Sequence, residues 1–223
     1  MNRSINILLL VFSMPAIAFT IIVGFDIPID FLKGSGANLP YRHIAFYVIA
    51  GILALFIGRR SVHRWVGVGM TKNPKRFIWC TEIGKERKRQ VRLYLVIEAI
   101  VAGFFAFTSY YLTPEAWPLT AVYGFMMLDQ VLFLLLAQSW FRVGVTKNAV
   151  VVADREVRIL YFSGLRRVES HQQTIYFEYI EELQLFFPTN AIPAGKFTEF
   201  RDCIEQQVNR DKVFFSEKFK GLK

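Results

Sequence analysis

Two carboxylates lie inside long apolar stretches, where a charge is costly. Glu98 falls within residues 93–112 and Asp129 within residues 117–139. Ionisable groups in hydrocarbon usually face other helices or a water-filled path, so both are candidates for a functional site. Three roles stay open for them: packing through hydrogen bonds to a neighbouring helix or a partner, a proton or ion path, and catalysis. Their depths differ by about 6 Å at the helical rise, which allows one polar network but argues against a tight pair.

The other residue types that carry chemistry are scattered along the chain. His43, His63 and His171 fall in three different segments, and no Cys/His/carboxylate spacing typical of a metal site occurs. The sequence has no Gly-rich phosphate loop and no G-x-S-x-G or H-E-x-x-H motif. Cys80 and Cys203 are two lone thiols, which we expect to be reduced and to fill apolar space. We therefore expect no catalytic residue, no metal and no cofactor.

Four apolar stretches must position the two carboxylates. A membrane-spanning helix needs about 20 mostly apolar residues, and the stretches that meet or approach this length are residues 6–25, 43–58, 93–112 and 117–139. Arg3 and the Ala16-Ile17-Ala18 triplet resemble a cleaved signal peptide. The apolar run continues well past Ala18, so an uncleaved anchor is the favoured interpretation. Residues 1–141 are thus predicted to form a four-span, α-helical membrane domain.

The segment between the second and third spans, residues 59–92, carries the charge of the protein. It holds eleven basic residues and two acidic ones, an excess equal to the whole net charge of +9. Lys and Arg in short loops beside spans stay on the cytoplasmic side. We therefore expect a basic cytoplasmic loop, both termini in the cytoplasm, and a multi-pass protein of the bacterial inner (cytoplasmic) membrane.

A localised cluster of cations predicts a localised anionic partner. The favoured partner is the anionic lipid headgroups of the inner leaflet; RNA, including the ribosome, is the alternative, and DNA is not expected. The predicted contacts are the eleven basic residues Arg59, Arg60, Arg64, Lys72, Lys75, Arg76, Lys85, Arg87, Lys88, Arg89 and Arg92. Amphipathic aromatics prefer the headgroup level, which predicts interfacial anchors at Trp65, Phe77, Trp79, Trp117 and Trp140.

Beyond residue 141 the hydrophobic period changes to that of strands. The runs FRVGV, AVVVA, EVRILYF and TIYFEYI are separated by short turn signals, and a further strand is expected over 181–187. Residues 197–208 then repeat apolar side chains at helical spacing, with Phe197, Phe200, Cys203, Ile204 and Val208 on one stripe. Residues 142–210 are predicted to form a small cytoplasmic β domain capped by one helix. The basic, aromatic tail 211–223 is expected to be disordered or to lie on the membrane.

One short internal similarity suggests a duplication. Residues 65–73 match residues 140–148 at six of nine positions, and each copy follows an inward-running span. Duplication and chance both remain open. A true duplication predicts that residues 71–73 begin a strand pair that joins the C-terminal sheet.

Four spans followed by short meandering strands, with the phrase YFEYIEELQL at residues 176–185 before an amphipathic helix, resemble the bacterial pleckstrin-homology-like (PH-like) membrane proteins. The resemblance covers about residues 140–209 and implies an α+β PH-like domain that recognises lipid or protein. We expect a non-enzymatic accessory or scaffold subunit of an inner-membrane complex, with other membrane proteins as partners. The alternatives are a small transporter or channel component that uses Glu98 and Asp129, and a docking factor that binds a ribosome or other RNA.

Overall fold

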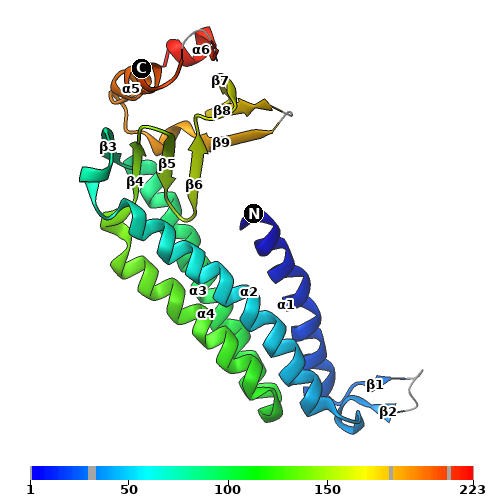
Figure 1. Cartoon of the computed structure of the whole chain (residues 1–223). Coiled ribbons are helices and arrows are strands. Elements are labelled where there is room, and N and C mark those ends of the chain that lie inside the picture. The colour runs from blue at the N-terminus through cyan, green and yellow to red at the C-terminus, as the bar shows by residue number, and fades with distance from the viewer. Residues whose placement is uncertain (1, 30–33, 181–182, 210–211, 223) are drawn as a thin grey trace. The chain divides into compact units, whose positions relative to one another are not determined.

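Four long helices dominate the first part of the chain in the computed structural model, which describes residues 2–29, 34–180, 183–209 and 212–222. They are α1 (Asn2–Gly24), α2 (Arg42–Thr71), α3 (Lys85–Leu112) and α4 (Trp117–Leu136) (Figure 1). Each is long and apolar enough to cross a membrane, as the sequence predicts, and at most 28% of the most apolar stretch of any of them is buried within the protein. The remaining apolar side chains are therefore available to lipid.

The chain divides into two compact units. The first, called the helical unit, comprises Met1–His63 and Tyr94–Leu135. The second, called the β unit, comprises Arg64–Leu93 and Leu136–Lys223. The β unit thus takes in the segment between α2 and α3 as well as the C-terminal region.

The core of the helical unit joins α1, α2 and α4. Phe46 and Leu53 of α2 and Leu119 and Tyr123 of α4 are almost fully buried in one apolar cluster with residues of α1. At one end of this unit the guanidinium of Arg42 donates two hydrogen bonds of 2.7 Å to the carboxylate of Glu115. A bidentate pair of this kind fixes the starts of α2 and α4 relative to each other.

Residues 59–92, expected to form a loop, are mostly helical. Helix α2 continues to Thr71 and α3 begins at Lys85, so the connection between the two α-helices is reduced to residues 72–84, which include one 3-10 turn at Pro74–Arg76. Within the β unit, the last turns of α2 are stabilised by packing: Val68 is fully buried, and the Thr71 hydroxyl donates to the backbone oxygen of Trp140 at 2.7 Å. The polar sequence concealed this extension because its stabilising contacts come from residues more than 60 positions later.

Two four-stranded sheets form the β unit (Figure 1). The first has the order β3-β4-β5-β6 and is antiparallel throughout; its strands are β3 (Trp79–Glu82), β4 (Arg142–Val145), β5 (Ala149–Ala153) and β6 (Val157–Tyr161). The second has the order β10-β7-β8-β9; its strands are β7 (Leu165–His171), β8 (Thr174–Tyr179), β9 (Gln184–Pro188) and β10 (Phe214–Phe215). Two further strands of two residues each, β1 (Pro28–Ile29) and β2 (Gly34–Ser35), pair antiparallel between α1 and α2.

The first of these strands comes from between the spans. β3 pairs antiparallel with β4, in the register Trp79 with Val145 and Glu82 with Arg142. The backbone extends the pairing at both ends, where Ile78 donates to the Val145 oxygen and Ile83 to the Phe141 oxygen. A segment that precedes α3 is therefore a full member of a sheet whose other strands follow α4.

The similarity between residues 65–73 and 140–148 does not extend to their structure. Residues 65–71 are the helical end of α2, whereas Arg142–Val145 is strand β4. The expected strand pair beginning at residues 71–73 is absent from this described stretch. The one strand that joins the sheet from here, β3, starts eight residues after Thr71.

Most of the predicted C-terminal elements are observed. Strands β4, β5, β6 and β8 fall on the four expected runs, and the strand expected over 181–187 is found as β9, with residues 181 and 182 outside the described residues. Helix α5 (Phe197–Gln207) buries Phe197, Phe200, Cys203 and Ile204, and Val208 directly after it is buried too. This is the predicted apolar stripe.

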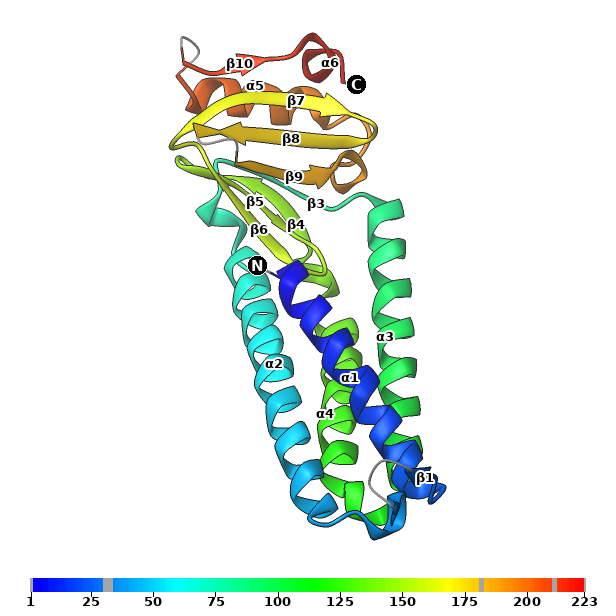
Figure 2. The same cartoon turned by 90° about the vertical axis from the view of Figure 1, so that its right-hand side faces the viewer.

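The C-terminal tail is folded where the structure describes it. Residues 214 and 215 form β10 and Glu217–Lys220 form the short helix α6. Figure 2 shows both beside α5 and β7. Val213, Phe215 and Phe219 are buried, so the expectation of a disordered tail is wrong for residues 212–222, whereas its position on the membrane stays a prediction.

Candidate functional site

The two intramembrane carboxylates are each bound by α2. Glu98 of α3 forms an ion pair with Arg60, with 2.7 Å between Oε2 and the guanidinium NH2. Asp129 of α4 accepts a hydrogen bond of 2.9 Å from the hydroxyl of Ser61. Because Arg60 and Ser61 are adjacent, one turn of α2 holds a carboxylate from each of the two neighbouring helices.

The partners explain how these charges are tolerated. An unpaired charge in an apolar bundle is costly, whereas an oppositely charged guanidinium within hydrogen-bond distance offsets much of that cost. The side chains of Arg60 and Glu98 are 13% and 22% exposed, and Asp129 and the adjacent Gln130 are buried. We interpret the cluster as a polar connection between α2, α3 and α4.

The eleven basic residues fall into two groups. The exposed group is Arg59, Lys72, Lys75, Arg76, Lys85, Arg89 and Arg92. The other four are at least partly buried, and three of them bind acids of this chain: Arg60 binds Glu98, Arg87 binds Asp154, and Lys88 lies 3.8 Å from Glu82. The fourth, Arg64, is 3% exposed. Only the exposed group is free to meet an external anion in the way the sequence suggested.

The aromatic residues expected at the membrane interface are largely part of the β unit's packing. Phe77 lies against Gly144, where a Cβ atom would come within 2.4 Å of the ring. Trp79 packs on Phe200 with 5.4 Å between ring centroids and donates its indole N–H to Glu199 at 3.1 Å. Strand β3 carries Trp79 into the sheet, and this long-range pairing is what the interfacial interpretation missed.

The remaining three aromatics have different surroundings. Trp65 and Trp140 are half-buried, and the ammonium of Lys72 lies 4.9 Å from the Trp140 ring centroid. Trp117 of the helical unit is 55% exposed and meets Tyr47 edge to face at 5.7 Å. Trp117 therefore keeps the exposure that an interfacial anchor needs.

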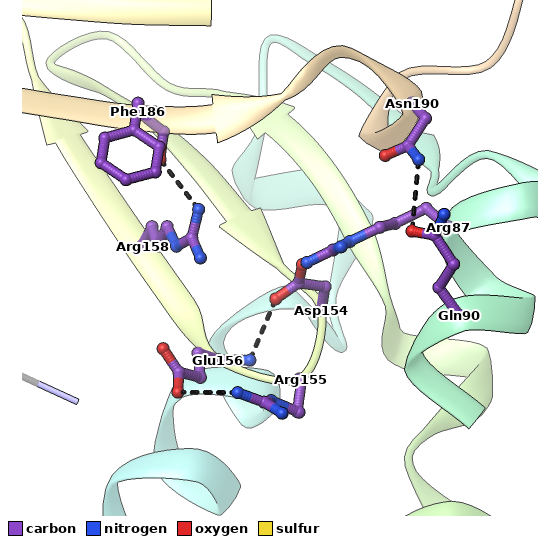
Figure 3. A network of polar contacts seen from close by, with 8 residues as sticks. All are labelled: Arg87, Gln90, Asp154, Arg155, Glu156, Arg158, Phe186 and Asn190. Atoms are coloured by element: carbon purple, nitrogen blue, oxygen red, sulfur yellow. Dashed lines mark hydrogen bonds and ion pairs between the residues drawn. The ribbon is translucent and has the colours of Figure 1, made fainter. Parts of the chain in front are cut away.

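A polar network that the sequence did not reveal ties α3 to the sheets of the β unit (Figure 3). Arg87 donates twice to Oδ2 of Asp154, at 2.9 Å from Nε and 2.5 Å from NH2. The other oxygen of Asp154 accepts the backbone N–H of Glu156 at 3.0 Å. Three residues after Arg87 on α3, the side-chain oxygen of Gln90 accepts a hydrogen bond of 3.3 Å from the amide of Asn190. Arg87 was predicted to bind lipid or RNA, but here it neutralises a carboxylate that is 2% exposed.

The same close view shows how the two sheets meet. Arg158 of β6 donates to the backbone oxygen of Phe186 in β9 at 2.9 Å, and its guanidinium lies 5.7 Å from the Phe186 ring centroid (Figure 3). β6 and β9 are each the last strand of their sheet. A side chain, not a backbone ladder, therefore bridges the two sheet edges.

A cavity of about 660 Å³ lies beside this network within the β unit. Its wall combines the start of α3, the β7–β8 turn and the segment between β9 and α5, including Lys85, Glu86, Gln90, Gln173, Asn190 and Phe197. The Oδ1 atom of Asn190 is buried there without a hydrogen-bond partner. The cavity offers charged, amide and apolar groups at once.

Three groups of the β unit have perturbed pKa values. Hydrogen bonds from Lys196 and, less strongly, from Trp79 lower the pKa of Glu199. Burial raises the pKa of the Cys203 thiol and raises the pKa of Tyr179 to about 12. Each perturbation has a structural cause in packing or a local ion pair.

Within the described part of the chain, no group of three or more His, Cys, Asp or Glu side chains could hold a metal ion. Comparison with protein-family models, with curated proteins and with solved structures finds no match to this chain.

Proposed function

We propose that this chain is a non-enzymatic accessory or scaffold subunit of a bacterial inner-membrane complex, with the β unit as a PH-like recognition domain at the cytoplasmic face. The single observation that carries the proposal is the pairing of β3 with β4. It makes the connection between the second and third helices part of the recognition domain itself. A domain built into the spans in this way is suited to presenting a surface at a membrane.

The pairing also constrains topology. β3 precedes α3 and β4 follows α4, so the two strands can meet only if α3 and α4 together return the chain to the same side. With four spanning helices, both termini then share that side. The basic residues beside the spans favour the cytoplasm as that side.

The exposed cations supply the proposed contact with anionic headgroups. Lys72, Lys75 and Arg76 follow α2, and Lys85, Arg89 and Arg92 lie on the first turns of α3. Each basic residue near an anionic surface contributes about 1 kcal/mol to attachment. Several together would hold the β unit at the membrane and leave its sheets to bind a partner.

The polar cluster of the helical unit supports packing as the role of Glu98 and Asp129. The Glu98 carboxylate has a guanidinium partner and the Asp129 carboxylate has a hydroxyl partner, both on α2. A proton or ion path would need these groups to exchange partners. The observed pairing instead favours a fixed arrangement of α2, α3 and α4.

Affinity purification in mild detergent, with identification of the retained proteins, lipids and RNA, tests the proposal. The informative variant is Lys85→Glu with Arg89→Glu, because both side chains are exposed on α3. Lys212→Glu with Lys218→Glu is the matched control, with the same charge change on exposed residues of the same unit. We expect wild type to retain membrane proteins and anionic lipid, the Lys85/Arg89 variant to lose lipid and complex together, and the control to resemble wild type.

Two outcomes would replace the proposal. Loss of RNA without loss of lipid from the Lys85/Arg89 variant would favour a docking factor for an RNA-bearing particle. The second outcome concerns the double variant Glu98→Gln with Asp129→Asn. If its complex stays intact but an ion or solute flux measured in proteoliposomes is lost, a transporter component would be favoured.

A further inference from the structure

The C-terminal strap, defined here as residues 212–222, is bound to the β unit like a short peptide ligand. At its start the backbone N–H groups of Lys212 and Val213 both donate to the Asn209 oxygen. The strap then runs along β7 as the two-residue strand β10 and ends in the single turn α6. Figure 2 shows this strap lying at the edge of the sheet beside α5.

The backbone of the strap extends the sheet. β10 pairs parallel with β7, in the register Phe214 with Arg167 and Phe215 with Val168, and the Ser216 N–H donates to the Val168 oxygen at 3.0 Å. On its other side β7 pairs with β8. Without the strap, β7 would be an edge strand with unpaired backbone groups, which is the usual template for adding a strand.

Two phenylalanine side chains anchor the strap. Phe215 and Phe219 are 7% and 1% exposed and stack on each other with 5.9 Å between centroids. The Ser216 hydroxyl accepts the Phe219 N–H and so closes the turn that brings the rings together. Phe214, between buried neighbours, is 57% exposed, and the Arg167 guanidinium lies 5.3 Å from its ring centroid.

A side chain of α5 also contacts the strap: Arg201 donates to the backbone oxygen of Lys220 at 2.7 Å. The edge of β7 together with Arg201 of α5 is called the strap site here. The strap site holds an extended pair of residues, a buried ring, a turn, and a second buried ring four positions after the first. These are the features of a peptide-recognition surface: backbone pairing supplies affinity, and pockets for particular side chains supply specificity.

We propose that the strap site, the edge of β7 with Arg201 of α5, is the docking site for a partner subunit, and that the strap is a tethered competitor for it. The partner segment carries two aromatic residues four positions apart and adds to β7 as a parallel strand. This inference rests on the proposed scaffold function and names the surface and the class of partner for it. The strap's own pairing is the template for the partner's.

Binding of a synthetic peptide tests whether the strap site recognises such a segment, and the test does not require the partner to be known. The probe is a fluorescent peptide of residues 212–222, KVFFSEKFKGL, and the receptor is the full chain in detergent. Wild-type chain should bind the peptide weakly, because a short tether gives its own strap an effective concentration of about a millimolar. The full chain carrying Phe215→Ala and Phe219→Ala should bind the same peptide at least about tenfold more tightly, since its strap no longer competes.

Variants of the peptide distinguish specific recognition from non-specific hydrophobic binding. Replacing the buried Phe219 with alanine in the peptide should weaken binding at least about tenfold, as expected for a buried anchor. The matched replacement of the exposed Phe214 should weaken it less than about fivefold, because only a contact with an exposed guanidinium is lost. Equal binding of the two altered peptides, or no binding to a folded Phe215/Phe219 chain, would overturn the proposal.

Two further measurements test the proposal even if the chain carrying Phe215→Ala and Phe219→Ala fails to fold. Ser216→Pro keeps the observed φ of −67° and both rings but removes the N–H that donates to Val168 and the hydroxyl that accepts from Phe219, so it should also raise peptide affinity. In wild type, amide hydrogens of residues 213–219 should exchange faster than those of β8, and exchange only on global unfolding would contradict a releasable strap.

A second copy of this chain is the other possible occupant of the strap site. A dimer held by exchanged straps, and lost in the Phe215/Phe219 chain, would assign the strap site to that second copy and overturn the partner assignment. Failure of the proposed function appears instead as the absence of any retained complex, whatever the peptide does.

Discussion

Arg87→Ala tests whether the network between α3 and the sheets holds the β unit together. The change removes the guanidinium that donates twice to Asp154 and leaves a carboxylate that is 2% exposed. Breaking a buried ion pair by removing one partner costs about 3–5 kcal/mol. Asp154 keeps its hydrogen bond from Glu156, so we expect the lower end, about 3 kcal/mol, which is a rise of about 150-fold in the opening equilibrium.

The thiol of Cys203 provides the assay. It is a buried residue of α5, so its labelling by a maleimide in increasing urea reports opening of the β unit, and mass spectrometry separates it from Cys80. Arg89→Ala is the matched control, since Arg89 lies two residues away on the same helix and is exposed. Its effect should stay within about 0.5 kcal/mol.

A double-mutant cycle shows whether the cost comes from the unpaired charge. Arg87→Ala with Asp154→Ala should recover part of the loss, because no buried charge is then left without a partner. A cost below about 1 kcal/mol for Arg87→Ala, or strict additivity of the two changes, would refute the reasoning.

Three more predictions concern single side chains of the β unit. Gly67→Ala would place a Cβ atom 2.5 Å from Val157 and should cost about 1–3 kcal/mol relative to Gly69→Ala, where nothing lies within 4 Å; urea unfolding in detergent compares the two. The lowered pKa of Glu199 means that its contacts add stability above its ordinary pKa of 4.5, and that this stability is lost as the pH falls through the folded-state pKa. The stability difference between wild type and Glu199→Gln should therefore vanish on acidification, and a constant difference would contradict the assignment. Burial and the raised pKa of Cys203 predict alkylation at pH 8 at least about tenfold slower than that of free cysteine, and equal rates would show that the thiol is exposed.

Local patterns in the sequence predicted local structure well. The apolar stripe of α5 is visible because helical periodicity needs only neighbours three and four positions apart. The runs that became β4, β5, β6 and β8 are visible because β-branched and aromatic residues gather between short turn signals, which is also a local pattern. β7 escaped notice because Leu165–His171 carries three charges and a register irregularity between Leu165 and Arg167, which interrupts strict alternation.

Contacts between distant parts of the sequence were not predictable. β3 is recognisable as a strand only when β4, some 60 residues later, is seen beside it. Likewise Arg60, read as a lipid or RNA contact, is defined by its pairing with Glu98 on another helix. Composition gives the charge of residues 59–92 but cannot say which cations are already neutralised.

Membrane-impermeant maleimide labelling tests the central claim, that the connection between α2 and α3 and the C-terminal sheets share the cytoplasmic side. Single cysteines at exposed positions, Lys212→Cys in the strap and Asn38→Cys before α2, would be introduced into a chain lacking Cys80 and Cys203. In intact spheroplasts we expect labelling at position 38 only, and labelling at position 212 only after lysis. Labelling of position 212 in intact spheroplasts would contradict the account.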